Sequence, residues 1–105
     1  MKKVTNKEII NGCINVLENS NYRTEFGMRP INRWSNGKGF GWTFDKKIKM
    51  IFTFTIEKMN IKVIAYSGDS YGKIWDYDIP SNATANNMVE MFEMEFQKYL
   101  TRVGF

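Results

Sequence analysis

The sequence predicts an α+β protein, an antiparallel β-meander of four to five strands with N- and C-terminal helices packed on one face (order α-β-β-β-β-α). Two observations predict it. Apolar residues recur with helical spacing near both ends of the chain, and they alternate with polar residues in the segments between. The 105 residues suit one domain, which we place at residues 1–105.

Two amphipathic helices are predicted. The first covers residues 6–19, and Thr5 and Glu8 form a T-x-x-E capping box at its start. Cys13 falls in its apolar arc, so we interpret this cysteine as a core residue. The second helix covers about residues 84–103. Because each helix has one apolar stripe, both are expected on the same face of the sheet, which leaves the other face open or in an interface.

Alternating apolar residues predict the strands. The strand-like segments are residues 22–28, 31–34, 40–44, 49–57, 61–66 and 73–79. Pro30 indicates an edge, a bend or a bulge between the first two of them. The Asn36-Gly37 pair is the strongest hairpin signal in the chain and predicts a turn before residues 40–44.

The residue types that are missing argue against an enzyme. The chain has no histidine, which removes the commonest general base and the commonest zinc ligand. Its one cysteine has no histidine to activate it. Asp69, Asp76 and Asp78 match no Mg²⁺-binding loop, and we interpret them as charges on an edge strand. We therefore predict no catalytic residue, no metal site and no cofactor.

The same composition predicts a cytoplasmic protein that does not enter a membrane. One cysteine cannot form an internal disulfide, which small secreted domains usually need. A charged helix, and not an apolar signal core, follows the basic first residues. The apolar runs are far shorter than a bilayer-spanning helix requires.

Positive charge is concentrated in residues 22–50, which hold seven basic and two acidic residues. Aromatic faces combined with cations suit single-stranded nucleic acid. The predicted binding residues for nucleic acid or another partner are Arg29, Arg33, Trp34, Lys38, Lys46 and Lys47. The alternative is a solvated hairpin rim, where lysines discourage pairing between strand edges.

One segment resembles a known motif. Trp34-Ser35-Asn36-Gly37-Lys38-Gly39-Phe40-Gly41-Trp42 resembles the first RNA-binding motif of cold-shock domains, roughly W-F-N-x-x-K-G-F-G-F, and Ile51-Phe52-Thr53-Phe54 resembles their V-F-V-H motif. The likeness covers about twenty residues, its Trp-to-Lys spacing is one residue short, and Phe54 stands in place of the histidine. The residues that the resemblance implies for base stacking and backbone contact are Trp34, Lys38, Phe40, Trp42 and Phe52. Two helices have no place in the five-stranded barrel of that family, so a different fold is expected.

These observations predict a small non-enzymatic binding or regulatory protein that acts on nucleic acid or on a nucleic-acid-processing complex through the basic, aromatic hairpin region. The alternative is a protein–protein inhibitor of phage or mobile-element type, for example an anti-defence protein that docks on a host protein. A second alternative is a symmetric oligomer that forms through the open sheet face or an edge strand. Surface residues that suit a protein partner are Tyr66, Tyr71, Met91 and Met94.

Overall fold

The computed structural model describes residues 4–46 and 49–104 of the chain. The elements are α1 (Asn6–Glu18), α2 (Tyr22–Glu25), β1 (Asn32–Arg33), β2 (Gly39–Phe44), β3 (Met50–Glu57), β4 (Asn60–Ser67), β5 (Ser70–Asp78) and α3 (Ala85–Arg102). The predicted α+β class is confirmed, since α1 and α2 precede an antiparallel sheet and α3 follows it.

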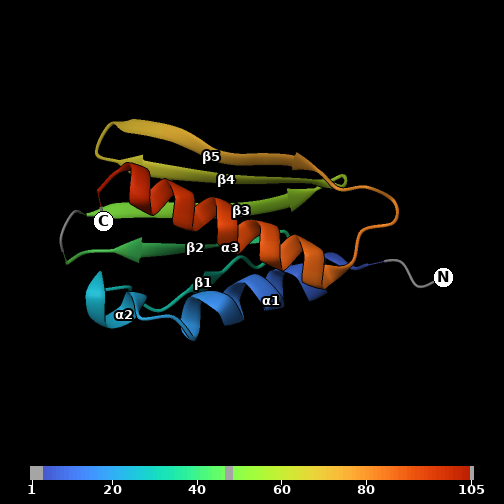
Figure 1. The fold of residues 1–105 in the computed structure, drawn as a ribbon, viewed down its shortest axis with the longest axis horizontal. Coiled ribbons are helices and arrows are strands. Elements are labelled where there is room, and N and C mark those ends of the chain that lie inside the picture. Colours follow the sequence, from blue (N-terminus) through green and yellow to red (C-terminus); the bar gives the residue numbers. More distant parts are fainter. Residues whose placement is uncertain (1–3, 47–48, 105) are drawn as a thin grey trace.

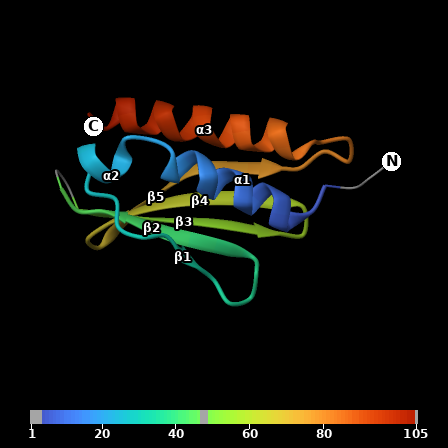
Figure 2. The ribbon, with the colours of Figure 1, turned by 90° about the horizontal axis from the view of Figure 1, so that it is seen from below.

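The five strands form one open sheet in the order β1-β2-β3-β4-β5, so each strand pairs with its neighbours in the chain. Figure 1 shows α1 and α3 lying across this sheet side by side. Seen from below, both helices lie on one side of the sheet and the opposite face is uncovered (Figure 2). None of the helices in the described ranges combines the length and the apolarity that a membrane crossing requires.

Threonine caps fix where the two long helices begin. The Thr5 hydroxyl accepts a hydrogen bond from the Glu8 amide at 3.2 Å, and the Thr84 hydroxyl accepts one from the Asn87 amide at 3.2 Å. Each bond satisfies a donor that the first turn of a helix would otherwise leave free. The predicted helix starts are therefore confirmed.

The core is a layer of aromatic rings between the sheet and α3. The register places Phe40 opposite Phe54 and Trp42 opposite Phe52, all with side chains buried under the helices. Phe96 of α3 meets Phe52 edge-on, with 5.1 Å between ring centroids and an interplanar angle of 90°. Rings in such contact bury large apolar areas, so this layer holds α3 on the sheet.

The prediction of a strand over residues 22–28 is wrong, because Tyr22–Glu25 form the short helix α2. Tyr22 and Phe26 lie one helical turn apart, and their rings stack at 5.6 Å. Both rings pack against Phe44, so tertiary burial selects the helical spacing over the strand spacing. Met28 forms only an isolated bridge with Phe44. The next predicted segment, residues 31–34, is confirmed only over the two residues of β1.

Candidate binding surfaces

The structure does not bring the predicted binding residues together in one cluster. Arg29 and Lys46 lie near the Phe44 end of β2, whereas Arg33, Trp34 and Lys38 lie near its Gly39 end. The Arg29 amide donates to the Thr43 carbonyl and Arg33 lies opposite Phe40, so these two are three positions apart along β2, about 10 Å at roughly 3.4 Å per residue. Lys38 and Lys46 flank the two ends of the strand. Lys47 lies outside the described residues.

Most of these cations already have a partner. Arg29 Nη1 lies 3.4 Å from Asp45 Oδ2, and Lys46 Nζ donates to the Thr24 carbonyl at 2.8 Å. At the other end of β2, Lys38 Nζ lies 3.3 Å from Glu57 Oε1. These exposed pairs contribute little to stability, but they reduce the positive charge that an anionic ligand would meet.

Arg33 and Trp34 line a cavity of about 300 Å³ between α1 and the β1–β2 hairpin, here called the hairpin pocket. Its lining residues are Lys7, Ile10, Asn11, Arg33, Trp34, Gly37 and Gly39. Arg33 Nη1 donates to Asn11 Oδ1 at 2.8 Å and so joins the hairpin to α1. No carboxylate lines the pocket, and within residues 4–46 and 49–104 neither Lys7 nor Arg33 forms an ion pair. Two cations without acidic partners therefore lie at one cavity.

The indole of Trp34 lies against two glycines of β2. A β-carbon added at Gly39 would be 2.8 Å from Trp34 Cε3 and Cζ3, and one added at Gly41 would be 3.8 Å from Trp34 Nε1. The ring thus extends over both glycines, while Phe40 between them points into the core. Because Trp34 is only partly buried, the remainder of its ring is accessible to a ligand.

The stacking set implied by the cold-shock resemblance is wrong for three of its members. Phe40, Trp42 and Phe52 are at most 2% exposed, because their side chains face α3. Buried rings cannot stack on bases. Of that set, Trp34 and Lys38 remain at the surface. The room that the indole needs explains the glycine at position 39, where a β-carbon would lie 2.8 Å from two ring atoms.

Lys7 is the site residue that the sequence did not reveal. It belongs to the polar side of an amphipathic helix, where lysines are ordinary. Nothing in the sequence pattern links it to Arg33, 26 positions later. Only the position of α1 beside the hairpin brings both cations to the same cavity.

The uncovered face of the sheet carries an apolar row. The register places Ile51 beside Tyr66, and Tyr66 beside Tyr71. Ile51 is 46% exposed and Tyr71 is 75% exposed. The Tyr66 and Tyr71 ring centroids lie 6.0 Å apart. A row of this kind suits contact with a protein.

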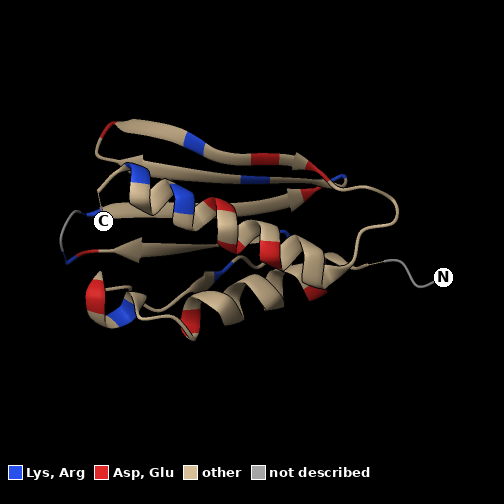
Figure 3. Cartoon of the chain, viewed as in Figure 1, with Lys and Arg blue, Asp and Glu red and all other residues tan. Residues whose placement is uncertain are grey.

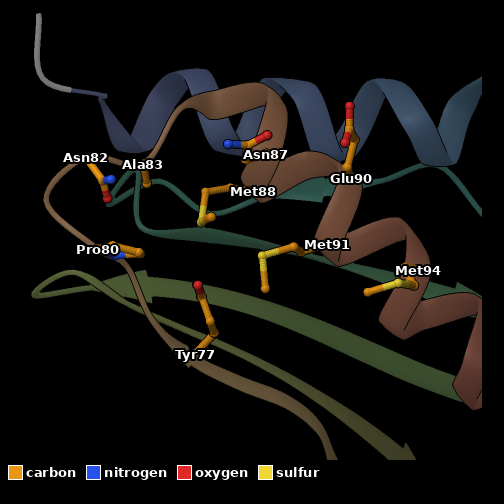
Figure 4. A pocket seen from close by; sticks show the side chains of 9 residues that line it. All are labelled: Tyr77, Pro80, Asn82, Ala83, Asn87, Met88, Glu90, Met91 and Met94. Atoms are coloured by element: carbon orange, nitrogen blue, oxygen red, sulfur yellow. The ribbon is translucent and has the colours of Figure 1, made fainter.

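A second cavity, of about 350 Å³, lies between the end of β5 and the first half of α3 (Figure 4). We call it the methionine groove, and its lining residues are Tyr77, Pro80, Asn82, Ala83, Asn87, Met88, Glu90, Met91 and Met94. Figure 4 shows the side chains of Met88 and Met91 pointing from α3 toward Tyr77. Met88 is buried, whereas Met94 is 48% exposed, so the groove has an apolar floor and an apolar rim.

The carboxylates of β5, on the uncovered face of the sheet, are held by hydrogen bonds. Asn60 Nδ2 donates to Asp76 Oδ1 at 2.9 Å and to Asp78 Oδ1 at 2.8 Å, and Lys73 Nζ lies 3.0 Å from Asp76 Oδ2. The bond from Asn60, followed by that from Lys73, lowers the pKa of the Asp76 carboxyl. In the described part of the chain, no group of three or more His, Cys, Asp or Glu side chains is placed to hold a metal ion.

We expect the Cys13 thiol to be inert in the folded protein. It is 0% exposed, and burial raises its pKa, so the reactive thiolate is suppressed. Alkylation by iodoacetamide at pH 8 should be slower than in denaturant by about a thousandfold or more, because it requires opening of the core. Mass spectrometry of timed samples gives both rates, and rapid native labelling would show that α1 separates easily from the sheet.

No family model, curated protein or solved structure matches this chain. Its own surfaces are therefore the basis for a function.

Proposed function

We propose that this chain is a non-enzymatic binding protein that takes single-stranded nucleic acid at the hairpin pocket. Lys7 and Arg33 would contact backbone phosphates, and the accessible part of the Trp34 ring would stack on a base. Nothing lies within 4 Å of a β-carbon added at Gly37, so the ligand backbone could approach closely there. The proposal includes a cytoplasmic location, where a free thiol such as that of Cys13 stays reduced.

The observation that carries this proposal is the charge of the pocket. Lys7, Arg33 and Trp34 line one cavity, and none of the described residues that line it is a carboxylate. Arg29 and Lys38, by contrast, each lie within 4 Å of a carboxylate oxygen. An anionic ligand would gain most from cations that lack a protein counter-charge, because it need not displace one.

The decisive experiment measures binding of a labelled oligothymidylate by fluorescence anisotropy at low salt. The double variant Lys7→Gln, Arg33→Gln is expected to weaken binding about tenfold or more, because both phosphate contacts are lost. The salt dependence should fall as well, by roughly 0.7 in log–log slope for each contact removed. Trp34→Leu keeps an apolar cover over Gly39 but should weaken binding through lost stacking, by about 1–3 kcal/mol.

A matched control is available at the far end of β2. The double variant Arg29→Gln, Lys46→Gln also removes two positive charges, but at positions outside the hairpin pocket. We expect it to bind the oligonucleotide almost as well as the wild type. If both double variants weakened binding equally, the effect would come from net charge and not from the hairpin pocket. Absence of binding at 20 mM salt would contradict the proposal.

A protein partner is the second candidate function, and the exposed row of Ile51, Tyr66 and Tyr71 favours it. The partner would be a host protein or a further copy of this chain. Light scattering detects the further copy, and retention from nuclease-treated lysate detects the host protein. In either case Ile51→Glu should abolish the contact, since it places a charge in the middle of the row.

A further inference from the structure

The outer edge of β5 is free. Within the described residues β5 pairs with β4 alone, and it is the last strand in the order of the sheet. A free edge presents backbone N–H and C=O groups on which a further strand can be added. The opposite edge strand, β1, has only two residues and offers much less.

The hydrogen-bond register shows which backbone groups of β5 point outward. The Ile79 amide donates to the Met59 carbonyl at 2.8 Å, so Ile79 directs its backbone groups toward β4. In an antiparallel pair, alternate residues point to the same neighbour. Tyr77, in register with Ile61, therefore also bonds to β4, whereas Asp76 and Asp78 direct their amides and carbonyls to the free edge.

The two faces beside this edge differ in chemistry. The Asp76 and Asp78 side chains lie on the uncovered face, held by Asn60. Lys73 forms an ion pair with Asp76, and Lys62 lies opposite it. Asp78 is therefore the carboxylate of this edge that is more open to a cationic partner. On the helix side, Tyr77 borders the methionine groove. An added strand alternates its side chains between the same two faces. Residues opposite the aspartates would therefore meet carboxylates, and the residues between them would enter the groove.

The negative charge of β5 and the first half of α3 favours a basic partner. Residues 70–95 contain one lysine against five carboxylates, namely Lys73 and Asp76, Asp78, Glu90, Glu93 and Glu95. Figure 3 shows acidic residues on the first half of α3 and near the end of β5. A second copy of the chain added to β5 would set this acidic side against itself, and nucleic acid would be repelled by it.

We propose that β5 accepts an extended segment of a partner protein in which lysine or arginine alternates with large apolar residues. The segment adds antiparallel to β5 as a sixth strand. Its basic residues lie opposite Asp76 and Asp78, where opposite charges on paired strands stabilise the sheet. Its apolar side chains fill the groove between Tyr77 and the methionines, whose flexible thioethers adapt to different shapes. The backbone supplies affinity and the groove supplies specificity.

The test uses a capped heptapeptide in which leucine and lysine alternate, titrated into the full-length, isotope-labelled chain and followed by NMR. We expect shifts at the amides of Asp76 and Asp78 and at the methyl groups of Met88, Met91 and Met94. N-methylation of the peptide at its lysines removes the N–H groups that donate to the β5 carbonyls. Binding should weaken at least about tenfold, which corresponds to the loss of about 1.4 kcal/mol of hydrogen bonding. N-methylation at its leucines, which point away from β5, should be tolerated.

Two further comparisons test charge and alternation. Asp78→Asn should weaken binding several-fold, whereas Glu18→Gln, an equal charge change at the exposed end of α1, should not. A peptide of the same composition with its leucines in one block should bind poorly. Equal binding of the lysine-methylated peptide, equal binding of the blocked peptide, or a dimer by light scattering that excludes the peptide from β5 would each overturn the proposal.

Discussion

Phe52→Ala is expected to lower the free energy of unfolding by about 3–5 kcal/mol. Phe52 is fully buried, and its ring stacks on Trp42 at 5.2 Å and meets Phe96 edge-on at 5.1 Å. Truncation leaves a cavity between the sheet and α3, and both neighbouring rings lose contact. Because small domains are stable by only about 5–15 kcal/mol, this loss is a large part of the total. Guanidinium denaturation followed by circular dichroism measures it.

The adjacent residue provides the control for this prediction. Ile51 lies on the same strand but on the uncovered face, where it is 46% exposed. We expect Ile51→Ala to cost less than about 1 kcal/mol, since most of the lost surface is already in water. If both variants destabilised the protein equally, the aromatic layer under α3 would not be the main core.

Gly39→Ala is expected to cost about 1–3 kcal/mol and to displace the β1–β2 hairpin. An added β-carbon meets the Phe54 carbonyl oxygen and lies 2.8 Å from two atoms of the Trp34 ring. The first of these neighbours is backbone in the middle of the sheet, so relief requires the strand itself to shift. The free energy of unfolding and the fluorescence of Trp34 should therefore change together, and oligonucleotide binding at the hairpin pocket should fall.

Gly72→Ala is the matched control for this second substitution. Nothing lies within 4 Å of a β-carbon at Gly72, and it also lies in a strand. Since glycine within a strand lowers the stability of a protein by roughly 0.5–1 kcal/mol relative to alanine, the Gly72→Ala protein should be as stable as the wild type or slightly more stable. A neutral result for Gly39→Ala as well would show that neither the indole nor the sheet requires Gly39.

The acidic side at β5 and the hairpin pocket lie at opposite edges of the sheet and have opposite charge. The hairpin pocket contains Lys7 and Arg33 without an acid, whereas the β5 edge carries Asp76 and Asp78. Substitutions at one edge should therefore leave binding at the other unchanged. This independence allows the two proposals to be tested on the same set of variants.

The class of fold follows from local patterns in the sequence, because the interactions responsible join residues close together in the chain. Helical spacing identifies both long helices, and the Thr5 capping box identifies the start of the first. Alternation identifies the strands from residue 40 onward. The prediction failed at Tyr22 and Phe26, whose spacing of four fits both a helix and one face of a strand. At these residues, packing of both rings against the distant Phe44 stabilises the helix over the strand.

Which side chains share a surface depends instead on how the helices and strands pack. A sequence shows that residues 22–50 are basic, but the strand β2 separates Lys38, before its first residue, from Lys46, beyond its last. The docking of α1 adds Lys7 to Arg33, and the sheet order leaves β5 beside the methionine groove. These proximities depend on packing between elements that are distant in the chain, and no local pattern encodes them.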